Sequence, residues 1–246
     1  VHDTEGAGFG VNGGDDILMA HNTLYRVGSR SHVIEVGFGS RSCDGNQAAC
    51  RAYLAQGGWG TAVVGGDEPI PNRNVFIYDN VVYNPDGYAS RWQQFAIADP
   101  RTPTVGSNIP APARADTNLQ IRGNVIWNGP ADHPLGIGQP ALADAVLSGN
   151  AINTVRPVLV DPAHGNFALA AAASLPAAIP IPDFAGGDAP TRPAPPTGRL
   201  SNAVAYAFSG APPRCRRSPP RSTRSPRPRP GRSRRSRSHS TAPCGA

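Results

Sequence analysis

The sequence of 246 residues contains no lysine, so all 23 of its basic residues are arginines. A chain without lysine offers neither a lysine general base nor a Schiff-base nucleophile. Methionine occurs once, aromatic residues make up 7%, and no run of eighteen apolar residues is present, so we expect no membrane span. Glycine and proline are frequent, with 28 and 27 residues, which favours many short strands joined by turns over a helical protein.

Acidic residues are absent from the last part of the chain. Residues 1–213 carry 12 arginines and all 17 acidic residues, a formal charge of −5, whereas residues 214–246 carry 11 arginines, a charge of +11. The tail 214–246 has no hydrophobic periodicity, so we expect it to be disordered. Its arginines suit RNA or another polyanion, although it has no aromatic residue to stack on bases. The alternative, which we favour, is that the tail is a translated frameshift or an incidental extension of a GC-rich gene. We then expect no nucleic-acid partner.

One short pattern recurs along the first 155 residues: an alternating strand, a corner asparagine and a second strand. Apolar residues that alternate with polar ones mark strands with one buried face. Repeats of this kind close their core by stacking on their neighbours. We therefore expect the corner asparagines to lie above one another, where their amides form a ladder. The pattern occupies residues 16–25, 74–83, 118–127 and 144–153, with Asn22, Asn80, Asn124 and Asn150 at the corners.

The corner asparagines are 58, 44 and 26 residues apart. If one coil takes about 22 to 29 residues, these intervals correspond to two coils, two coils and one coil. Residues 31–37 and 92–97 would then be strands of intermediate coils without a corner asparagine. Asparagine also tolerates the left-handed backbone that a corner needs. The alternative is a β-sandwich with Asn-rich turns, but sandwich turns vary in sequence whereas these corners recur in register.

Residues 74–84 and 118–128 resemble the repeats of right-handed parallel β-helix proteins, a superfamily that includes pectate lyases, polygalacturonases and chondroitinase-like lyases. Residues 157–169 are similar to the segment that closes the helix in bacterial members. The resemblance covers residues 1–208 and implies an all-β fold, a right-handed parallel β-helix (solenoid). We expect its coils over residues 1–155 and an extended, Pro-rich C-terminal cap over residues 156–213. Because a strand in full register begins at Asp16, we also expect a fragment or mature form that lacks earlier coils.

The resemblance implies a monomer that recognises an extracellular or cell-surface polysaccharide, and cleavage of that polysaccharide is the further activity it suggests. A non-catalytic surface or structural repeat protein and a polyanion-binding protein acting through its tail remain alternatives. A lyase would use an arginine or lysine base, often with Ca²⁺, and a hydrolase paired carboxylates. Asp16 is similar to part of the Asp-Asp motif of polygalacturonases, but their Gly-His-Gly and Arg-x-Lys motifs are missing, and a turn-forming role is favoured.

The other candidate catalytic residues are Arg26, as a base or charge neutraliser, and, separately, His32 and Glu35. Arg26 would need a strongly depressed pKa. His32 and Glu35 are three residues apart on one expected strand, so we predict that they face opposite ways. The alternative, which we favour, is that these residues are surface charges and hydrogen-bonded surface groups on the solenoid, and enzyme status stays open. Ca²⁺ is the one cofactor considered, with Asp3, Glu5, Asp15, Glu35, Asp67 and Glu68 as possible oxygen donors.

Aromatic residues on expected loops are the candidates for sugar binding. Trp59, Tyr88 and Trp92 stand beside polar residues, and an exposed ring of this kind stacks on a sugar. The alternative is that Trp59 and Trp92 pack their loops onto the coils.

Two of the cysteines bracket a short loop. We predict that Cys43 and Cys50 form a disulfide, which implies an oxidising compartment and supports an extracellular location. Two cysteines without a nearby histidine do not make a zinc site, so no metal centre is expected there. We assign no role to Cys215 and Cys244 in the tail.

Overall fold

The computed structural model describes residues 1–40, 46–55, 59, 68–129, 132–133, 141, 145–170 and 175–184. All of them belong to one compact unit, Val1–Asn202. The elements in chain order are β1 (His2–Thr4), β2 (Phe9–Asn12), β3 (Asp15–Ala20), β4 (Thr23–Val27), β5 (Ile34–Gly37), α1 (Gln47–Ala55), β6 (Arg73–Tyr78), β7 (Val81–Asn84), β8 (Phe95–Ile97), β9 (Leu119–Arg122), β10 (Val125–Asn128), β11 (Ala145–Ser148), β12 (Ala151–Ile152), β13 (Leu159–Asp161), η2 (Pro162–His164) and β14 (Asn166–Leu169).

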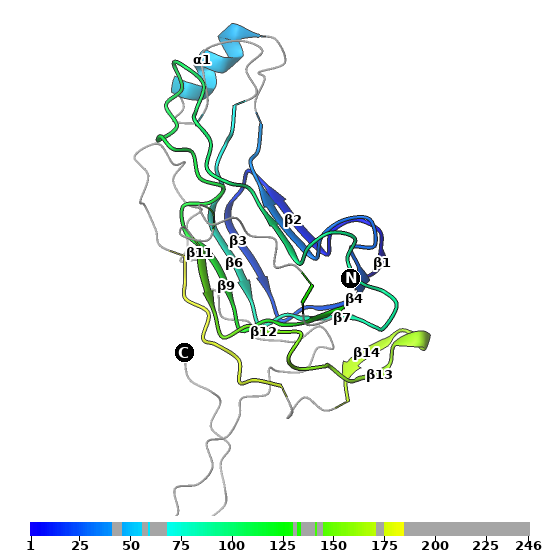
Figure 1. The fold of residues 1–246 in the computed structure, drawn as a ribbon. Helices are drawn as coiled ribbons and strands as arrows, with labels where there is room; N and C mark the ends of the chain where they lie inside the picture. Colours follow the sequence, from blue (N-terminus) through cyan, green and yellow to red (C-terminus); the bar gives the residue numbers. More distant parts are fainter. Residues whose placement is uncertain are drawn as a thin grey trace, which may run out of the picture. The chain divides into compact units, whose positions relative to one another are not determined.

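Strands β1 to β12 form three parallel sheets (Figure 1). The five-stranded sheet has the order β1-β4-β7-β10-β12, the four-stranded sheet β11-β9-β6-β3, and the three-stranded sheet β2-β5-β8. In chain order, β3 belongs to the four-stranded sheet, β4 to the five-stranded sheet and β5 to the three-stranded sheet. Strands β6, β7 and β8 repeat this order, and one such series of strands is called a pass here. The prediction of an all-β chain built mainly of parallel strands is confirmed.

The core lies between the three sheets and consists of the inward residues of each strand. Val75 and Ile77 enter it from β6, Val82 from β7 and Phe95 from β8, all with 0% of their surface exposed. Each fully buried side chain of this kind contributes about 1.5 to 3 kcal/mol. Because the strands are short, this core forms only when successive passes stack, as the repeat predicts.

The predicted number of coils is wrong for the first two intervals between the asparagines, where two coils were expected, and correct for the third, where one was expected. Thr23 pairs directly with Val81, Val81 with Val125, and Val125 with Ala151, so each interval is a single pass. The long intervals arise because residues 38–72, which include α1, and residues 98–118 are insertions between passes. Residues 31–37 and 92–97 do not form extra coils; they contain β5 and β8, the third strands of the same two passes.

The left-handed residue of the repeated corner is the one before the asparagine. His21, Asp79, Gly123 and Gly149 have φ values of 56°, 52°, 68° and 66°. The asparagine itself therefore serves the corner through its hydrogen bonds and not through its backbone conformation. Glycine in the last two of these positions carries no steric cost for positive φ.

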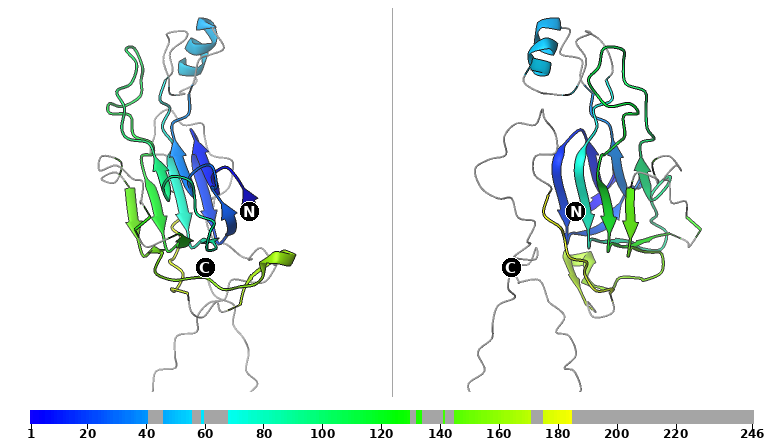
Figure 2. Two further views of the ribbon diagram at one scale, coloured as in Figure 1. Left: turned by 45° about the vertical axis from the view of Figure 1, so that its right-hand side comes forward. Right: turned by 90° about the vertical axis from the view of Figure 1, so that its left-hand side faces the viewer.

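The C-terminal part of the unit begins with an antiparallel hairpin. In it, β13 pairs with β14. Residues 175–184 then run extended beside the four-stranded sheet (yellow in Figures 1 and 2), as their prolines predict. The tail 214–246, with Cys215 and Cys244, lies outside the described residues.

Cys50 is on α1 and only 1% exposed, while Cys43 lies outside the described residues, so their disulfide stays a prediction. Thiol titration of the unfolded, non-reduced protein should find no reactive thiol at these two positions. Peptide mapping should recover one cross-linked pair, and two alkylated cysteines at 43 and 50 would contradict the prediction.

Candidate functional site

The four corner asparagines form one hydrogen-bonded row. The Nδ2 of Asn22 donates to Asn80 Oδ1 at 3.0 Å, Asn80 donates to Asn124 Oδ1 at 2.9 Å, and Asn124 donates to Asn150 Oδ1 at 2.9 Å. The backbone N–H groups of Asn22, Asn80 and Asn124 donate to the same three oxygens. Asn80 and Asn124 are 0% exposed, so this row is a buried part of the fold and not a ligand site.

Asp16 belongs to a second polar row at the start of the four-stranded sheet. The Nδ2 of Asn74 donates to Asp16 Oδ1 at 2.8 Å, and the Nδ2 of Asn118 donates to Asn74 Oδ1 at 3.0 Å. Asp16 also has a positive φ of 54°. Asp16 lies within β3 and not at a turn before it, and its carboxylate is a hydrogen-bonded member of this row.

The candidate catalytic residues do not all converge. Asp16 is on β3, Arg26 on β4, and Glu35 on β5, which lie in three different sheets. Arg26 forms an ion pair with Asp3 at 3.0 Å, and its Cζ lies 5.0 Å from the centre of the Tyr88 ring.

His32 and Glu35 do come together, and the prediction that they face opposite ways is wrong. His32 Nδ1 lies 3.0 Å from Glu35 Oε1. The reason is that β5 begins only at Ile34, and Val33 and Ile34 are both 0% exposed. Two consecutive inward residues break the alternation at this corner, so the residues on either side of them share the outer face.

Glu35 is held as an ionised carboxylate by a network of neighbours. Burial raises the pKa of Glu35, but hydrogen bonds from Ser31 and His32 outweigh it and lower the pKa below its ordinary value. His32 Nε2 lies 2.8 Å from Gln93 Oε1. Because Ser31 donates to the carboxylate and not to the imidazole, the group lacks the nucleophile–base contact of a hydrolytic triad. It presents instead a carboxylate and an amide on the outer face.

Trp92 stands beside this network and is 53% exposed. Its ring centre lies 5.1 Å from that of His32. Together with Ser29, Arg30 and Arg91 it lines an open hollow of about 320 Å³. Arg30 forms an ion pair with Glu5 at 3.1 Å, whereas no acidic partner faces the guanidinium of Arg91 within the described residues.

Trp59 and Tyr88 are engaged in contacts within the protein. The Cζ of Arg73 lies 3.7 Å from the centre of the Trp59 ring, and the hydroxyl of Tyr88 donates to the carbonyl of Thr4 at 3.4 Å. Of the three aromatic candidates, Trp92 is therefore the one that combines wide exposure with a hollow and polar neighbours.

Sequence reasoning missed an aromatic row on the outer face of the five-stranded sheet. Tyr25, Tyr83 and Trp127 pair in register across β4, β7 and β10. Each stands three positions after a corner asparagine, and this shared position was the signal that could have revealed the row. The C-terminal part packs on it: the Arg156 Cζ lies 5.7 and 5.6 Å from the Tyr83 and Trp127 rings, and the Phe167 ring lies 5.6 Å from Tyr25.

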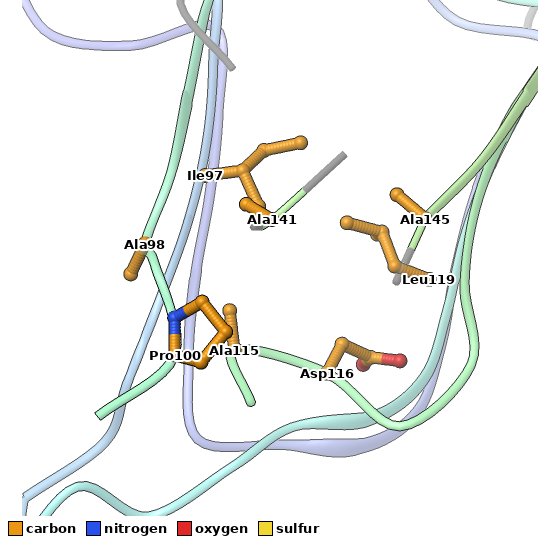
Figure 3. Close-up of a pocket in the computed structure, with 8 residues that line it drawn as sticks. All are labelled: Ile97, Ala98, Pro100, Ala115, Asp116, Leu119, Ala141 and Ala145. Atoms are coloured by element: carbon orange, nitrogen blue, oxygen red, sulfur yellow. The ribbon is translucent and has the colours of Figure 1, made fainter. Parts of the chain in front are cut away.

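A buried carboxyl group lines a small cavity at the end of the core (Figure 3). Burial raises the pKa of Asp116 to about 7, although its oxygens accept hydrogen bonds from the backbone of Asn118 and Val75. The cavity has a volume of about 10 Å³, which is room for a single water molecule and not for a sugar. Its other lining residues are Ile97, Ala98, Pro100, Ala115, Leu119, Ala141 and Ala145.

The suggested calcium donors do not gather in the part of the chain that the structure describes. No group of three or more His, Cys, Asp or Glu residues there is placed to hold a metal ion. Asp67 lies outside the described residues, and the buried Glu68 accepts a hydrogen bond from the backbone of Thr104 at 3.2 Å.

Among the described helices, none is long and apolar enough to cross a bilayer. Comparisons with protein-family models, curated proteins and solved structures found no match to this chain.

Proposed function

We propose that this protein is a parallel β-helix that acts outside the cell and binds an anionic polysaccharide on the outer face of its three-stranded sheet. The observation that carries the proposal is the exposed ring of Trp92 beside two arginines and the Glu35 network. The recurring order of the sheets supports the β-helix, because each pass adds one strand to every sheet it visits.

The position of the C-terminal segment supports this choice of face. Arg156 and Phe167 contact the aromatic row of the five-stranded sheet, and Phe184 packs on Phe76 of the four-stranded sheet. Two outer faces are therefore occupied by the chain itself. The hollow beside Trp92 lies at the turns that lead into β5 and β8 of the third sheet, so a long ligand meets side chains from two successive passes there.

The chemistry around the hollow fits an acidic sugar. The Trp92 ring is a stacking platform for the apolar face of a pyranose. Arg91, which has no acidic partner among the described residues, supplies a charge for a carboxylate or sulfate group. The ionised Glu35 and the amide of Gln93 accept and donate hydrogen bonds to sugar hydroxyls.

Binding can be tested by calorimetry against uronate-containing, sulfated and neutral polysaccharides. We expect binding to the acidic ones, weakened by about five- to thirtyfold by Trp92→Ala, since loss of a stacked ring costs about 1 to 2 kcal/mol. Arg91→Gln should weaken binding and reduce its dependence on salt. The matched controls are Trp59→Ala and Arg51→Gln, which change a tryptophan and an exposed arginine away from the hollow.

Equal affinity of the Trp92 variant and the wild-type protein would contradict the proposal, as would equal affinity for neutral and acidic polysaccharides. The same panel reads out cleavage. Release of unsaturated products would identify a lyase, and release of reducing ends alone a hydrolase. Binding without either product would identify a non-catalytic polysaccharide-binding protein.

A further inference from the structure

The extended segment of residues 175–184, called the strap here, lies against the outer face of the four-stranded sheet. Its apolar residues and its prolines face different ways. Pro176, Pro180 and Pro182 are exposed, whereas Leu175, Ile179, Ile181 and Phe184 are half-buried. The strap is not a strand of any sheet, and its prolines lack the N–H groups that a strand would need. It therefore binds the face mainly through side chains.

One anchor of the strap is an aromatic contact on β6. Val75 and Ile77 point into the core, so Phe76 and Tyr78 point outward, yet they are only 1% and 0% exposed. The ring of Phe184 lies 5.0 Å from that of Phe76. Phe184 of the strap therefore packs on a buried aromatic ring of the outer face.

The second anchor is a notch at the repeated corner. It forms because Gly123 and Gly149 stand at the corner position that His21 and Asp79 occupy in the earlier passes. A Cβ atom at Gly149 would lie 2.7 Å from Ile179 Cδ1, and one at Gly123 would lie 3.2 Å from Ile179 Cγ1. The backbone N–H of Ile179 donates to Asp79 Oδ1 at 3.0 Å. The notch therefore recognises both the side chain and the backbone of one strap residue.

We propose that this face of the four-stranded sheet is a peptide-binding site, that the strap is its resident and displaceable ligand, and that a peptide of the same kind binds there in trans. The ligand is an extended, proline-flanked peptide with an isoleucine for the notch and a phenylalanine five residues later. Proline keeps such a peptide extended before it binds, which reduces the entropy that binding costs. The raised pKa of Asp79, caused by burial, is consistent with close packing of the strap on its carboxylate. The inference is independent of the proposed polysaccharide site.

The test uses the full chain with Ile179→Asp and Phe184→Ala, which remove both anchors of the strap but leave the face intact. A fluorescein-labelled peptide of residues 175–184 is added, and its polarisation is measured. We expect the peptide to bind this variant at least about tenfold more tightly than it binds the wild-type protein, in which the strap competes. A peptide with the Ile179→Asp change should not bind.

A further variant tests the notch itself. Asp79→Gly in the strap-displaced chain removes the acceptor and keeps a residue that tolerates positive φ, as Gly123 does in the next pass. It should weaken peptide binding by about tenfold, the effect of losing a hydrogen bond to a charged group, whereas Asp79→Asn, which keeps the acceptor, should weaken it less.

Circular dichroism first checks that the double variant is folded. If it is not, the single variant Phe184→Ala takes its place and should bind the peptide more tightly than the wild-type protein does. A folded variant that does not bind the peptide would overturn the proposal and leave the strap as a fixed cover. Unfolding of both variants would overturn it as well, because a displaceable ligand cannot be required for folding.

Discussion

Replacement of Asn124 by valine should lower the free energy of unfolding by about 4 kcal/mol, because several buried polar groups would lose their partners at once. The Oδ1 of Asn124 accepts from the backbone and side-chain amides of Asn80, at 3.0 and 2.9 Å. Its Nδ2 donates to the carbonyl of Ile77 at 2.9 Å and to Asn150. Valine fills much of the same space but makes none of these bonds. Urea unfolding measures the loss, which should lower the melting temperature by roughly 10 °C.

Asn22→Val is the matched control for this prediction. Asn22 is the first residue of the same row, is only half-buried, and donates to Ala20 and Asn80. No hydrogen bond to its own Oδ1 is seen among the described residues, so its loss should cost about 1 to 2 kcal/mol. Equal costs for Asn22→Val and Asn124→Val would mean that depth within the row does not matter, and the energetic account of the ladder would then be wrong.

The sequence could predict the row of asparagines because the corner is set by local chemistry. An asparagine between two short apolar stretches, repeated in register, leaves few other structures available, although the sequence did not show that the residue before it takes the positive φ. The number of passes could not be predicted in this way. Insertions such as the one between β5 and β6 change the interval between repeats without changing the register that joins Thr23 to Val81.

The candidate site shows the same limit. Trp92 could be proposed from its loop and its polar neighbours, but the contact between His32 and Glu35 depends on a corner with two consecutive inward residues. Strict alternation predicts opposite faces there, and only the pairing of β5 with β2 and β8 shows where the strand begins. The face occupied by the strap depends on contacts between residues 100 positions apart, such as Asp79 and Ile179. No local pattern carries that information.

The protein should become less stable as the pH rises from about 4 to about 8, because the carboxyl group of Asp116 then loses its proton. Its pKa is raised from 3.8 to about 7 in the folded state, chiefly by burial, so the folded protein holds a proton that the unfolded chain releases. This contribution is fully present below pH 3.8 and is lost as the pH rises through about 7. At about 1.4 kcal/mol for each pH unit, the loss amounts to about 4 kcal/mol. Urea unfolding at several pH values measures it.

The comparison that isolates this effect is with Asp116→Asn, which has no proton to lose. The difference in unfolding free energy between wild type and this variant should shift by about 4 kcal/mol in favour of the variant between pH 4 and 8. Asp86→Asn, a change at a side chain that is 77% exposed, should leave the wild-type pH dependence unaltered. Asp15 raises the pKa of Asp116 through its charge, so Asp15→Asn should move the midpoint of the transition to lower pH. A constant difference between wild type and Asp116→Asn across this range would show that the carboxyl group is ionised in the folded protein at pH 4, and that the cavity beside it is wet enough to solvate the charge.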